Sequence, residues 1–327
     1  MRLDTQKHEF DRHLLSEIEK ISVLDNWHSL LAVTIDYSII AIAIAAKHFI
    51  GWAIYPLSVI VIGSRQRALA TIVHEAAHGT LARNKILSLI LATLFSGYLI
   101  FSTFNAYKAS HVAGHHGSFG DPELDADYRY MLKKGVYDIK GERRYVWEIF
   151  IKPFLLGNVP SYLAYLMKAR SLSVENRSAR LENILLGAYW LVIVLVALAL
   201  RQAHNLLLFW IVPFLTSFQV IGWFIELAEH GPLMRNSINL RMTRNRHSHW
   251  LEQFLTGMHG ENYHLAHHLR PRVPFWKMPA LHRILLRDPA YQQWDSQCGG
   301  IFASNNGAPS VISFLMNQCR QRMVLDL

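Results

Sequence analysis

The chain has 327 residues, of which 51% are hydrophobic, and it carries 33 Lys and Arg residues against 24 Asp and Glu residues. This apolar content is high for a soluble protein, so membrane proteins are the first class to consider. The net charge of +9 would suit a nucleic-acid-binding protein, but no recognition motif or stripe of basic and aromatic residues supports that class. Anionic lipid headgroups and an acidic redox partner are better explanations of the charge.

Several apolar stretches approach the roughly 20 residues that a membrane-spanning helix needs. We predict an all-α integral membrane protein with four spans in a single domain that covers residues 1–327. The spans are expected at about residues 29–46, 49–70, 183–200 and 206–228. The first 26 residues are polar and lack the apolar core of a signal peptide, so we expect the first span to act as its own targeting signal.

The distribution of Lys and Arg predicts the orientation of these spans. The connections at residues 47–48 and 201–205 carry little positive charge, and most basic residues lie elsewhere. By the positive-inside rule, both termini and a cap formed by residues 105–180 and 229–327 belong in the cytoplasm. The apolar segment 86–104 lies between two cytoplasmic regions, so we predict a re-entrant or interfacial segment there. The inner membrane of a bacterium is the expected location.

The 18 histidines of the chain gather in clusters beside the predicted spans. On a helix, residues i and i+4 share a face, so such a pair can direct two imidazoles at one metal ion. Adjacent histidines point about 100° apart, so a doublet beside such a pair suits two metal ions better than one. The clusters therefore predict a two-metal site at the cytoplasmic ends of the spans. Their members are His74 and His78; His111, His115 and His116; His230; and His264, His267 and His268.

Zinc is the first alternative to iron at such a site. The segment from His74 to His78 matches the H-E-x-x-H pattern of zinc proteases, in which the glutamate is the general base. A zinc protease needs one further ligand, whereas this chain offers seven more histidines in the clusters. Imidazole is also a suitable ligand for iron, which explains the surplus. A membrane metal-binding or transport protein is the non-enzymatic alternative, but it would place polar residues deep in several spans, and few are seen beyond Asp36, Arg65 and Arg67.

The order and spacing of the clusters resemble the membrane fatty acid desaturase superfamily, which also includes fatty acid hydroxylases and beta-carotene ketolases. The most specific segment runs from Asn262-Tyr263-His264 to Phe275-Trp276 and is similar to the bacterial desaturase and ketolase form of the third histidine motif. The resemblance covers nearly the whole chain. It implies two iron ions that activate O2 to attack an unactivated C–H bond. The iron ligands that it implies are His74, His78, His111, His115, His116, His230, His264, His267 and His268.

The resemblance leaves the reaction and the substrate open. A second hydrogen abstraction gives an alkene and oxygen rebound gives an alcohol, and the ligand spacing does not decide between them. The leading prediction is a desaturase of a fatty acyl or lipid substrate. A hydroxylase or ketolase is the alternative, including one that acts on a small polar or amino-acid-like biosynthetic intermediate. The sequence has no iron–sulfur ligand motif and no glycine-rich nucleotide motif, so a separate ferredoxin, rubredoxin or haem protein is expected to donate the electrons.

Three carboxylates near the clusters are candidates for supporting roles. Asp121 and Asp125 follow the second cluster and are predicted to orient metal-bound imidazoles, because carboxylates often accept the second ring N–H. The alternative is a solvated loop in which they cap a helix. The resemblance implies a role for Glu226, which lies four residues before His230, where many desaturases have an asparagine that holds one iron through water.

Arg67 and three other histidines complete the candidates. Arg67 lies on the same predicted helical face as His74 and His78, so it can hold an anionic group of a short substrate beneath the irons. The alternative is an arginine that extends to the lipid headgroups. We expect His247, His249 and His259 to be loop histidines. Cys298 and Cys319 fall in the cytoplasmic tail and are expected to remain reduced.

Overall fold

A computed structural model describes residues 6–138, 141–171 and 177–325. In this part of the chain the secondary structure is helical apart from two isolated β-bridges, which confirms the predicted all-α class. The chain divides into two compact units, and each is described by itself. Unit 1 contains residues 1–23, 114–157 and 223–327, and unit 2 contains residues 24–113 and 158–222.

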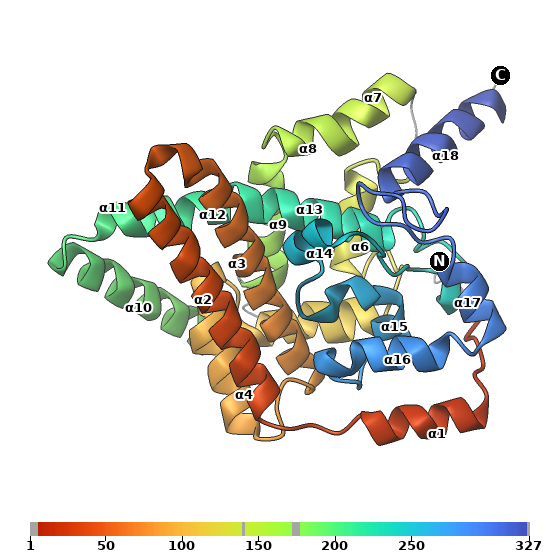
Figure 1. The fold of residues 1–327 in the computed structure, drawn as a ribbon, viewed down its shortest axis with the longest axis horizontal. Coiled ribbons are helices and arrows are strands. Elements are labelled where there is room, and N and C mark those ends of the chain that lie inside the picture. The colour runs from red at the N-terminus through yellow and green to blue at the C-terminus, as the bar shows by residue number, and fades with distance from the viewer. Residues whose placement is uncertain (1–5, 139–140, 172–176, 326–327) are drawn as a thin grey trace. The chain divides into compact units, whose positions relative to one another are not determined.

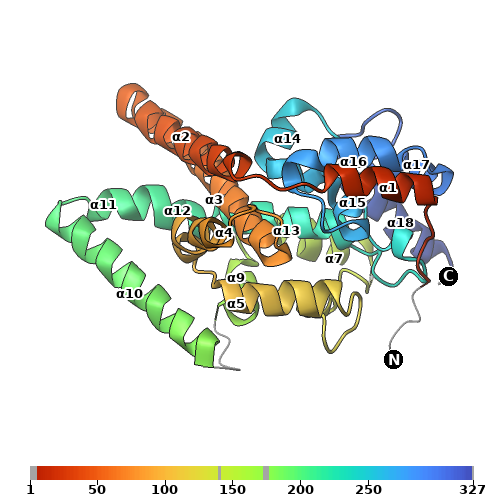
Figure 2. The ribbon, with the colours of Figure 1, turned by 90° about the horizontal axis from the view of Figure 1, so that it is seen from below.

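Unit 2 contains the long apolar helices, and α2 and α3 lie side by side within it (Figure 1). Helix α10 is followed by a sharp turn into α11 (Figure 2). The helices of this unit are α2 (Trp27–Ile50), α3 (Tyr55–His78), α4 (Lys85–Ala92), α5 (Phe104–Tyr107), α9 (Val159–Arg170), α10 (Arg177–Ala199), α11 (Ala203–Leu206) and α12 (Val212–Leu215), with the short segments η1 (Trp52–Ile54), η2 (Thr93–Gly97), η3 (Tyr98–Ile100) and η6 (Leu207–Ile211). Helix α13 (Ser217–His230) begins in unit 2 and ends in unit 1.

Three helical runs among the described residues are long and apolar enough to cross a membrane. They are Trp27–Ile50, Arg177–Ala199 and Ala203–His230, the last of which combines α11, η6, α12 and α13. These runs contain or closely match the predicted spans 29–46, 183–200 and 206–228. A bent helix pair at Lys85–Ile100 and Phe104–His116 raises the number of candidate spans to four if it counts as one span.

The predicted span at residues 49–70 differs from the helix in the structure. Phe49 and Ile50 belong to the end of α2, the chain turns at Gly51 with a φ of 102°, and α3 starts only at Tyr55. Helix α3 is not among the runs that pass the test for length and apolar composition. The polar side chains in the carboxyl half of α3, which the fold buries, lower the mean hydropathy of this helix.

The buried polar residues of α3 find partners inside unit 2. The Arg65 guanidinium lies 3.6 Å from the Asp36 carboxylate of α2, and both side chains are almost completely buried. The Gln66 amide donates a hydrogen bond of 2.9 Å to the carbonyl of Trp210. Because buried polar groups are tolerated when they are hydrogen-bonded or paired, α3 keeps these residues at the cost of a lower hydropathy.

The segment predicted to be re-entrant is part of the bent pair. The axes of Lys85–Ile100 and Phe104–His116 differ by 90°, and Phe101 at the break adopts a left-handed conformation with a φ of 57°. The buried Glu182 carboxylate accepts hydrogen bonds from the backbone N–H groups of Phe104 and Asn105, at 2.6 and 2.9 Å, where the second helix begins. A bend of this size belongs either to a broken span or to a re-entrant loop.

Unit 1 consists of shorter helices around an apolar core in which α1 packs along α16 (Figure 2). The core includes Phe10 and Ile18 from the amino-terminal segment together with Leu265, Leu281 and Tyr291. The helices are α1 (Arg12–Ile21), α6 (Ala126–Lys133), α7 (Glu142–Val146), α8 (Lys152–Phe154), α14 (Trp250–Thr256), α15 (His264–Leu269), α16 (Met278–Leu285), α17 (Pro289–Asp295) and α18 (Val311–Leu325), with the short segments η5 (Trp147–Ile151), η7 (Asn239–Arg241), η8 (Met258–Tyr263) and η9 (Phe275–Lys277). Segment η4 (Lys108–His116), a π-helix, contains the boundary between the two units.

Candidate metal centre

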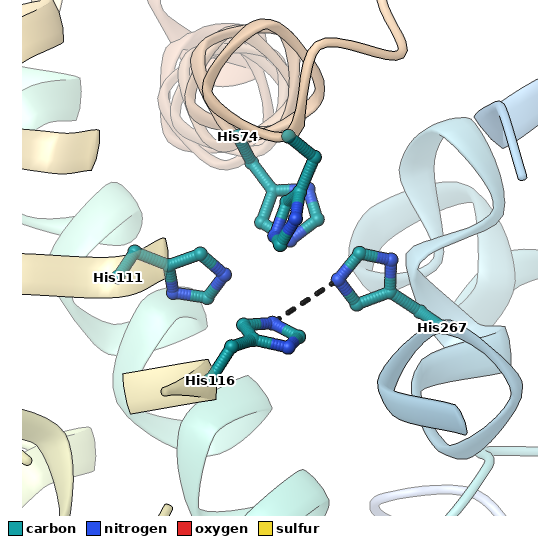
Figure 3. A group of neighbouring side chains, drawn as sticks. His74, His111, His116 and His267 are labelled. Atoms are coloured by element: carbon teal, nitrogen blue, oxygen red, sulfur yellow. Dashed lines mark hydrogen bonds between the residues drawn. The ribbon is translucent and has the colours of Figure 1, made fainter. Parts of the chain in front are cut away.

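Three of the predicted ligands converge within unit 2. His74 and His78 lie one turn apart at the end of α3, and their ring centroids are 4.7 Å apart. The ring of His111, which η4 carries, lies 4.7 Å from that of His74 (Figure 3) and 5.3 Å from that of His78. We call these three residues the unit 2 histidine group.

A glycine fixes the end of the helix that carries this group. Gly79 adopts a left-handed conformation with a φ of 77°, and the next N–H, of Thr80, donates to the carbonyl of Glu75. This is the usual way in which a helix closes on glycine. The Thr80 hydroxyl also donates 2.8 Å to the Glu75 carboxylate, whose other oxygen lies 3.1 Å from Nδ1 of His74. The helix end therefore also orients one imidazole.

Four further predicted ligands converge within unit 1. The Nε2 atom of His264 lies 2.9 Å from Nε2 of His230 and 3.0 Å from Nε2 of His268. The ring of His115 lies 4.7 Å from that of His230 and 5.1 Å from that of His268, measured between centroids. We call these four residues the unit 1 histidine group. The i, i+4 spacing of His264 and His268 places both on one face of α15, as predicted.

His116 and His267 lie beside the unit 1 group. Their Nε2 atoms are 3.3 Å apart (Figure 3, dashed line). The ring of His116 stacks on that of His268 with 4.2 Å between the centroids. The adjacent residues His267 and His268 have ring planes 86° apart, so the doublet presents two separate nitrogen atoms to its surroundings.

Buried carboxylates hold the second nitrogen of two histidines in the unit 1 group. Both Asp125 oxygens lie 3.1 Å from Nδ1 of His115, and an oxygen of Asp127 lies 3.7 Å from the same atom. One oxygen of Glu229 lies 3.3 Å from Nδ1 of His264, and the other is 2.9 Å from the Arg246 guanidinium. Carboxylate partners of this kind fix the ring orientation and leave Nε2 available to a metal.

The electrostatic environment differs between members of the unit 1 group. Burial lowers the pKa of His268 well below the usual value of an imidazole, and the neighbouring histidines lower it further. Burial acts in the same direction on His115, but the carboxylates of Asp125 and Asp127 outweigh it and raise the pKa of His115. His268 is therefore neutral at neutral pH, which is the form that binds a metal.

The other candidates from the sequence have distinct environments. Asp125 orients His115 and also caps α6, because it accepts from the N–H groups of Asp127 and Tyr128, so both predicted roles coincide in one side chain. Asp121 accepts from the N–H groups of Glu123 and Leu124, which is the loop-capping alternative.

Glu226 and Arg67 are half-buried. The negative charge of Glu226 helps to raise the pKa of His115, which places the carboxylate within electrostatic range of the unit 1 group. Arg67 lies on α3, which runs without a break from Tyr55 to His78, so Arg67 and the histidines are on one continuous helix, as its predicted placement requires.

The three remaining histidine candidates lie outside the clusters. His249 is exposed in a loop, His259 precedes α15 with a φ of 51°, and His247 pairs with Asp295.

Sequence reasoning missed Glu75 and Glu229 as carboxylates that orient imidazoles. Glu75 was considered only as the general base of a protease. Its place directly after His74 was the signal that identified it as a partner of that ring. Glu229 precedes His230 but pairs with His264, and nothing in the sequence indicates a contact between residues 35 positions apart.

The donor set fits iron. The Nδ1 side of His264 faces a carboxylate, so its proton belongs there and Nε2 presents a lone pair toward two other imidazoles. A cation at this point satisfies several nitrogen lone pairs at once. Donor groups made of histidines with carboxylates behind them, and without thiolates, suit iron and other imidazole-binding transition metals.

Comparisons with known proteins agree with this donor set. The profile of the family described as "Fatty acid desaturase" matches residues 50–296. Dihydrorhizobitoxine desaturase of Bradyrhizobium elkanii is 38% identical over 320 residues, which cover 96% of this chain and 91% of that protein. The chloroplastic sn-2 acyl-lipid omega-3 desaturase (ferredoxin) of Helianthus annuus is 24% identical over 279 residues, which cover 78% of this chain and 61% of that protein.

Proposed function

Because the chain belongs to the fatty acid desaturase family, we propose that it is an iron-dependent membrane desaturase that introduces a carbon–carbon double bond with O2. The observation that carries this proposal is the convergence of imidazoles in each unit, with carboxylates on the Nδ1 atoms of His74, His115 and His264.

We assign the nine clustered histidines as ligands of two iron ions. The unit 1 group holds one iron through four imidazoles, and the unit 2 group contributes three imidazoles to the other. When bound, the iron pair supplies the oxidising power to break unactivated C–H bonds. For desaturation, O2, two electrons and two protons are consumed, two hydrogen atoms leave neighbouring carbons, and two water molecules form.

The protein's own groups set the geometry and the proton positions of this reaction. Asp125 and Glu229 hold protons on Nδ1 of His115 and His264, so the Nε2 atoms of these rings remain lone-pair donors. Burial of His115, His230 and His264 excludes water from the unit 1 group. Ligands held in fixed positions and an environment without water favour a single reaction at the substrate carbon over side reactions.

For the substrate, we propose a small polar molecule rather than a long acyl chain. A relative that covers nearly the whole chain at 38% identity is named for dihydrorhizobitoxine and not for an acyl lipid. Arg67 on the ligand-bearing helix α3 offers a cation to an anionic group of such a molecule. An acyl-lipid substrate is the second candidate, supported by the family description and by the plant relative, which is named for an acyl lipid.

Metabolite and lipid profiling of a host with and without the intact gene separates these two substrate classes. We expect a new alkene among the polar metabolites and an unchanged fatty acid profile. A new double bond in membrane lipids would replace the first substrate class with the second. A new hydroxyl group in either fraction would assign the protein to the hydroxylases, and no change in either fraction would favour a metal-binding protein.

An Arg67→Gln variant tests the proposed substrate contact. If Arg67 binds an anionic group of the substrate, the KM rises by about tenfold or more while the iron content stays unchanged, since one charge-assisted hydrogen bond contributes about 1.5–3 kcal/mol. The matched control is Arg201→Gln, which removes a cation from the exposed turn between α10 and α11. Equal KM values in both variants would remove Arg67 from the substrate site.

We further propose that the electrons come from a separate ferredoxin, rubredoxin or haem protein and that the histidines and both termini face the cytoplasm of a bacterial cell. The excess of basic residues supports an acidic donor. Turnover with each purified donor, measured as O2 consumption that depends on substrate, tests the first part. Protease accessibility of tags at both termini in sealed vesicles tests the second.

A further inference from the structure

A second group of possible metal ligands lies in unit 1 apart from the nine clustered histidines. It consists of His247 in the loop before α14, His282 in α16 and Asp295 at the end of α17, and we call it the His247 cluster. One ligand atom from each residue lies within 4.8 Å of the others. The cluster unites three segments that are separated in sequence.

The distances within this cluster match a shared ion. Nε2 of His247 lies 3.0 and 3.1 Å from the two oxygens of Asp295, and Nε2 of His282 lies 3.8 Å from one of them. Two ligands bound at about 2.0–2.1 Å to a tetrahedral ion are about 3.3 Å apart. The separation of 3.8 Å is too long for a hydrogen bond, so direct pairing leaves His282 without a strong bond to the carboxylate.

The groups behind these ligands are fixed as they are in metal sites. Nδ1 of His282 lies 2.9 Å from the hydroxyl of Tyr291. The Asn245 amide donates to that hydroxyl at 2.7 Å and to Asp295 at 2.6 Å. Hydrogen bonds on the far side of ligands orient them toward the ion and are a regular part of metal sites.

The cluster is partly open to solvent. The side chains of His247 and His282 are 20% and 13% exposed, so a water molecule can reach the cluster and complete the coordination.

We propose that His247, His282 and Asp295 bind one divalent transition-metal ion, with zinc as the preferred ion. Two imidazoles, one carboxylate and a water molecule form a four-coordinate set that zinc accepts. The ion is structural: it joins the loop at His247 to α16 and α17. Asn245, which donates to Asp295, also accepts a hydrogen bond from the N–H of Ala266 in α15. Through these two contacts the ion stabilises the helix that carries the third histidine motif.

Metal analysis of variants tests this site independently of the number of iron ions bound at the candidate metal centre. The full-length protein is produced in medium with equal iron and zinc and purified in detergent, and both metals are measured per chain. His247→Gln and Asp295→Asn should each lower the zinc content by about one ion per chain relative to the unmodified protein and leave the iron content unchanged. The matched control is His249→Gln, which removes an exposed histidine two residues away and should change neither metal.

A second measurement, of the melting temperature, tests the site in variants that fold poorly. Zinc added to chelator-treated protein whose iron has first been restored should raise the melting temperature of the unmodified protein and of His249→Gln, but not that of His247→Gln, because only binding to the folded state stabilises it. The proposal is overturned if the unmodified protein and His247→Gln carry the same total metal, or if added zinc shifts both melting temperatures equally. An unmodified protein that carries this zinc ion but no iron would count against the proposed function and not against this zinc site.

Discussion

The position of single protons determines which imidazole nitrogens can bind a metal. In the unit 1 histidine group, Asp125 and Glu229 face the Nδ1 atoms of His115 and His264, respectively, and thereby direct the Nε2 atoms to the metal side. These two carboxylates differ in what else they hold, since Asp125 also caps α6 and Glu229 also pairs with Arg246. The two contacts therefore predict different consequences on substitution.

Asp125→Asn should weaken iron binding or activity by about 10–100-fold, the usual effect of losing a partner of a metal-bound histidine. The asparagine keeps its side-chain oxygen for the helix cap, so α6 should persist. Iron content and O2 consumption measure the effect. Asp121→Asn is the control because Asp121 accepts from N–H groups of its own turn. An equal loss in both variants would show that the loop as a whole, and not the contact to His115, supports the site.

Glu229→Gln should lower the free energy of unfolding by about 3 kcal/mol, because it leaves the buried Arg246 guanidinium without its charged partner. Thermal unfolding in detergent measures this loss. The double variant Glu229→Gln/Arg246→Met removes both charges and should regain most of the stability, while the iron content stays low because His264 still lacks its carboxylate. Recovery of iron in the double variant would contradict the orienting role of Glu229.

Residues near one another in sequence were the predictable part of the site. The i, i+4 pairs and Asp125, ten residues after His115, follow from local spacing. The contact between Glu229 and His264 depends on how distant segments pack, and the sequence contains no signal for it. The same reason explains why the sequence predicts only a loop position for His247, whereas the structure shows a contact with Asp295, 48 residues away.

Helix α3 shows how composition and packing compete within one element. Hydropathy places a span near it but misplaces its start, because the polar residues 47–48 that indicate a connection belong to the last turn of α2, and the chain turns only at Gly51. The carboxyl half of α3 is buried by neighbouring helices and so does not need a lipid-like composition. The π-helical segments, including η4 with its three histidines, leave no recognisable pattern in the sequence, although π-helices are frequent at functional sites.

Gly63→Ala should destabilise unit 2 by about 1–3 kcal/mol, the typical cost of overpacking. A Cβ atom at this position of α3 would collide with Oγ of Ser217 and lie 2.7 Å from the backbone nitrogen of Phe218. The melting temperature in detergent is the measurement. Gly187→Ala on α10 is the control, since no atom lies within 4 Å of its added Cβ, and it should be neutral or stabilising by up to about 1 kcal/mol. Similar losses in both variants would refute the packing argument.

For the molecule as a whole, iron removal should lower the melting temperature, because ligands that bind only the folded state stabilise it by about 2.7 kcal/mol at a hundredfold excess over Kd. A chelator selective for iron, which leaves zinc in place, should therefore shift the melting temperature of the unmodified protein but not that of His78→Ala or His115→Ala variants that have already lost iron. His204→Ala, which alters an exposed histidine of α11, should respond like the unmodified protein. A melting temperature insensitive to the chelator in all four proteins would exclude a stabilising iron site.

The cap that Glu182 forms on the N–H groups of Phe104 and Asn105 cannot form until Glu182 has been synthesised. The carboxylate lies 78 residues downstream of the helix start that it satisfies, so a ribosome adding about 5–20 residues per second delivers it about 4–16 s after Phe104 has been made. Until then the helix that leads to His111 lacks the carboxylate that accepts from its first two N–H groups. A nascent chain arrested before Glu182 therefore lacks the contact that sets this helix, and capture of iron belongs to the finished polypeptide rather than to the growing one.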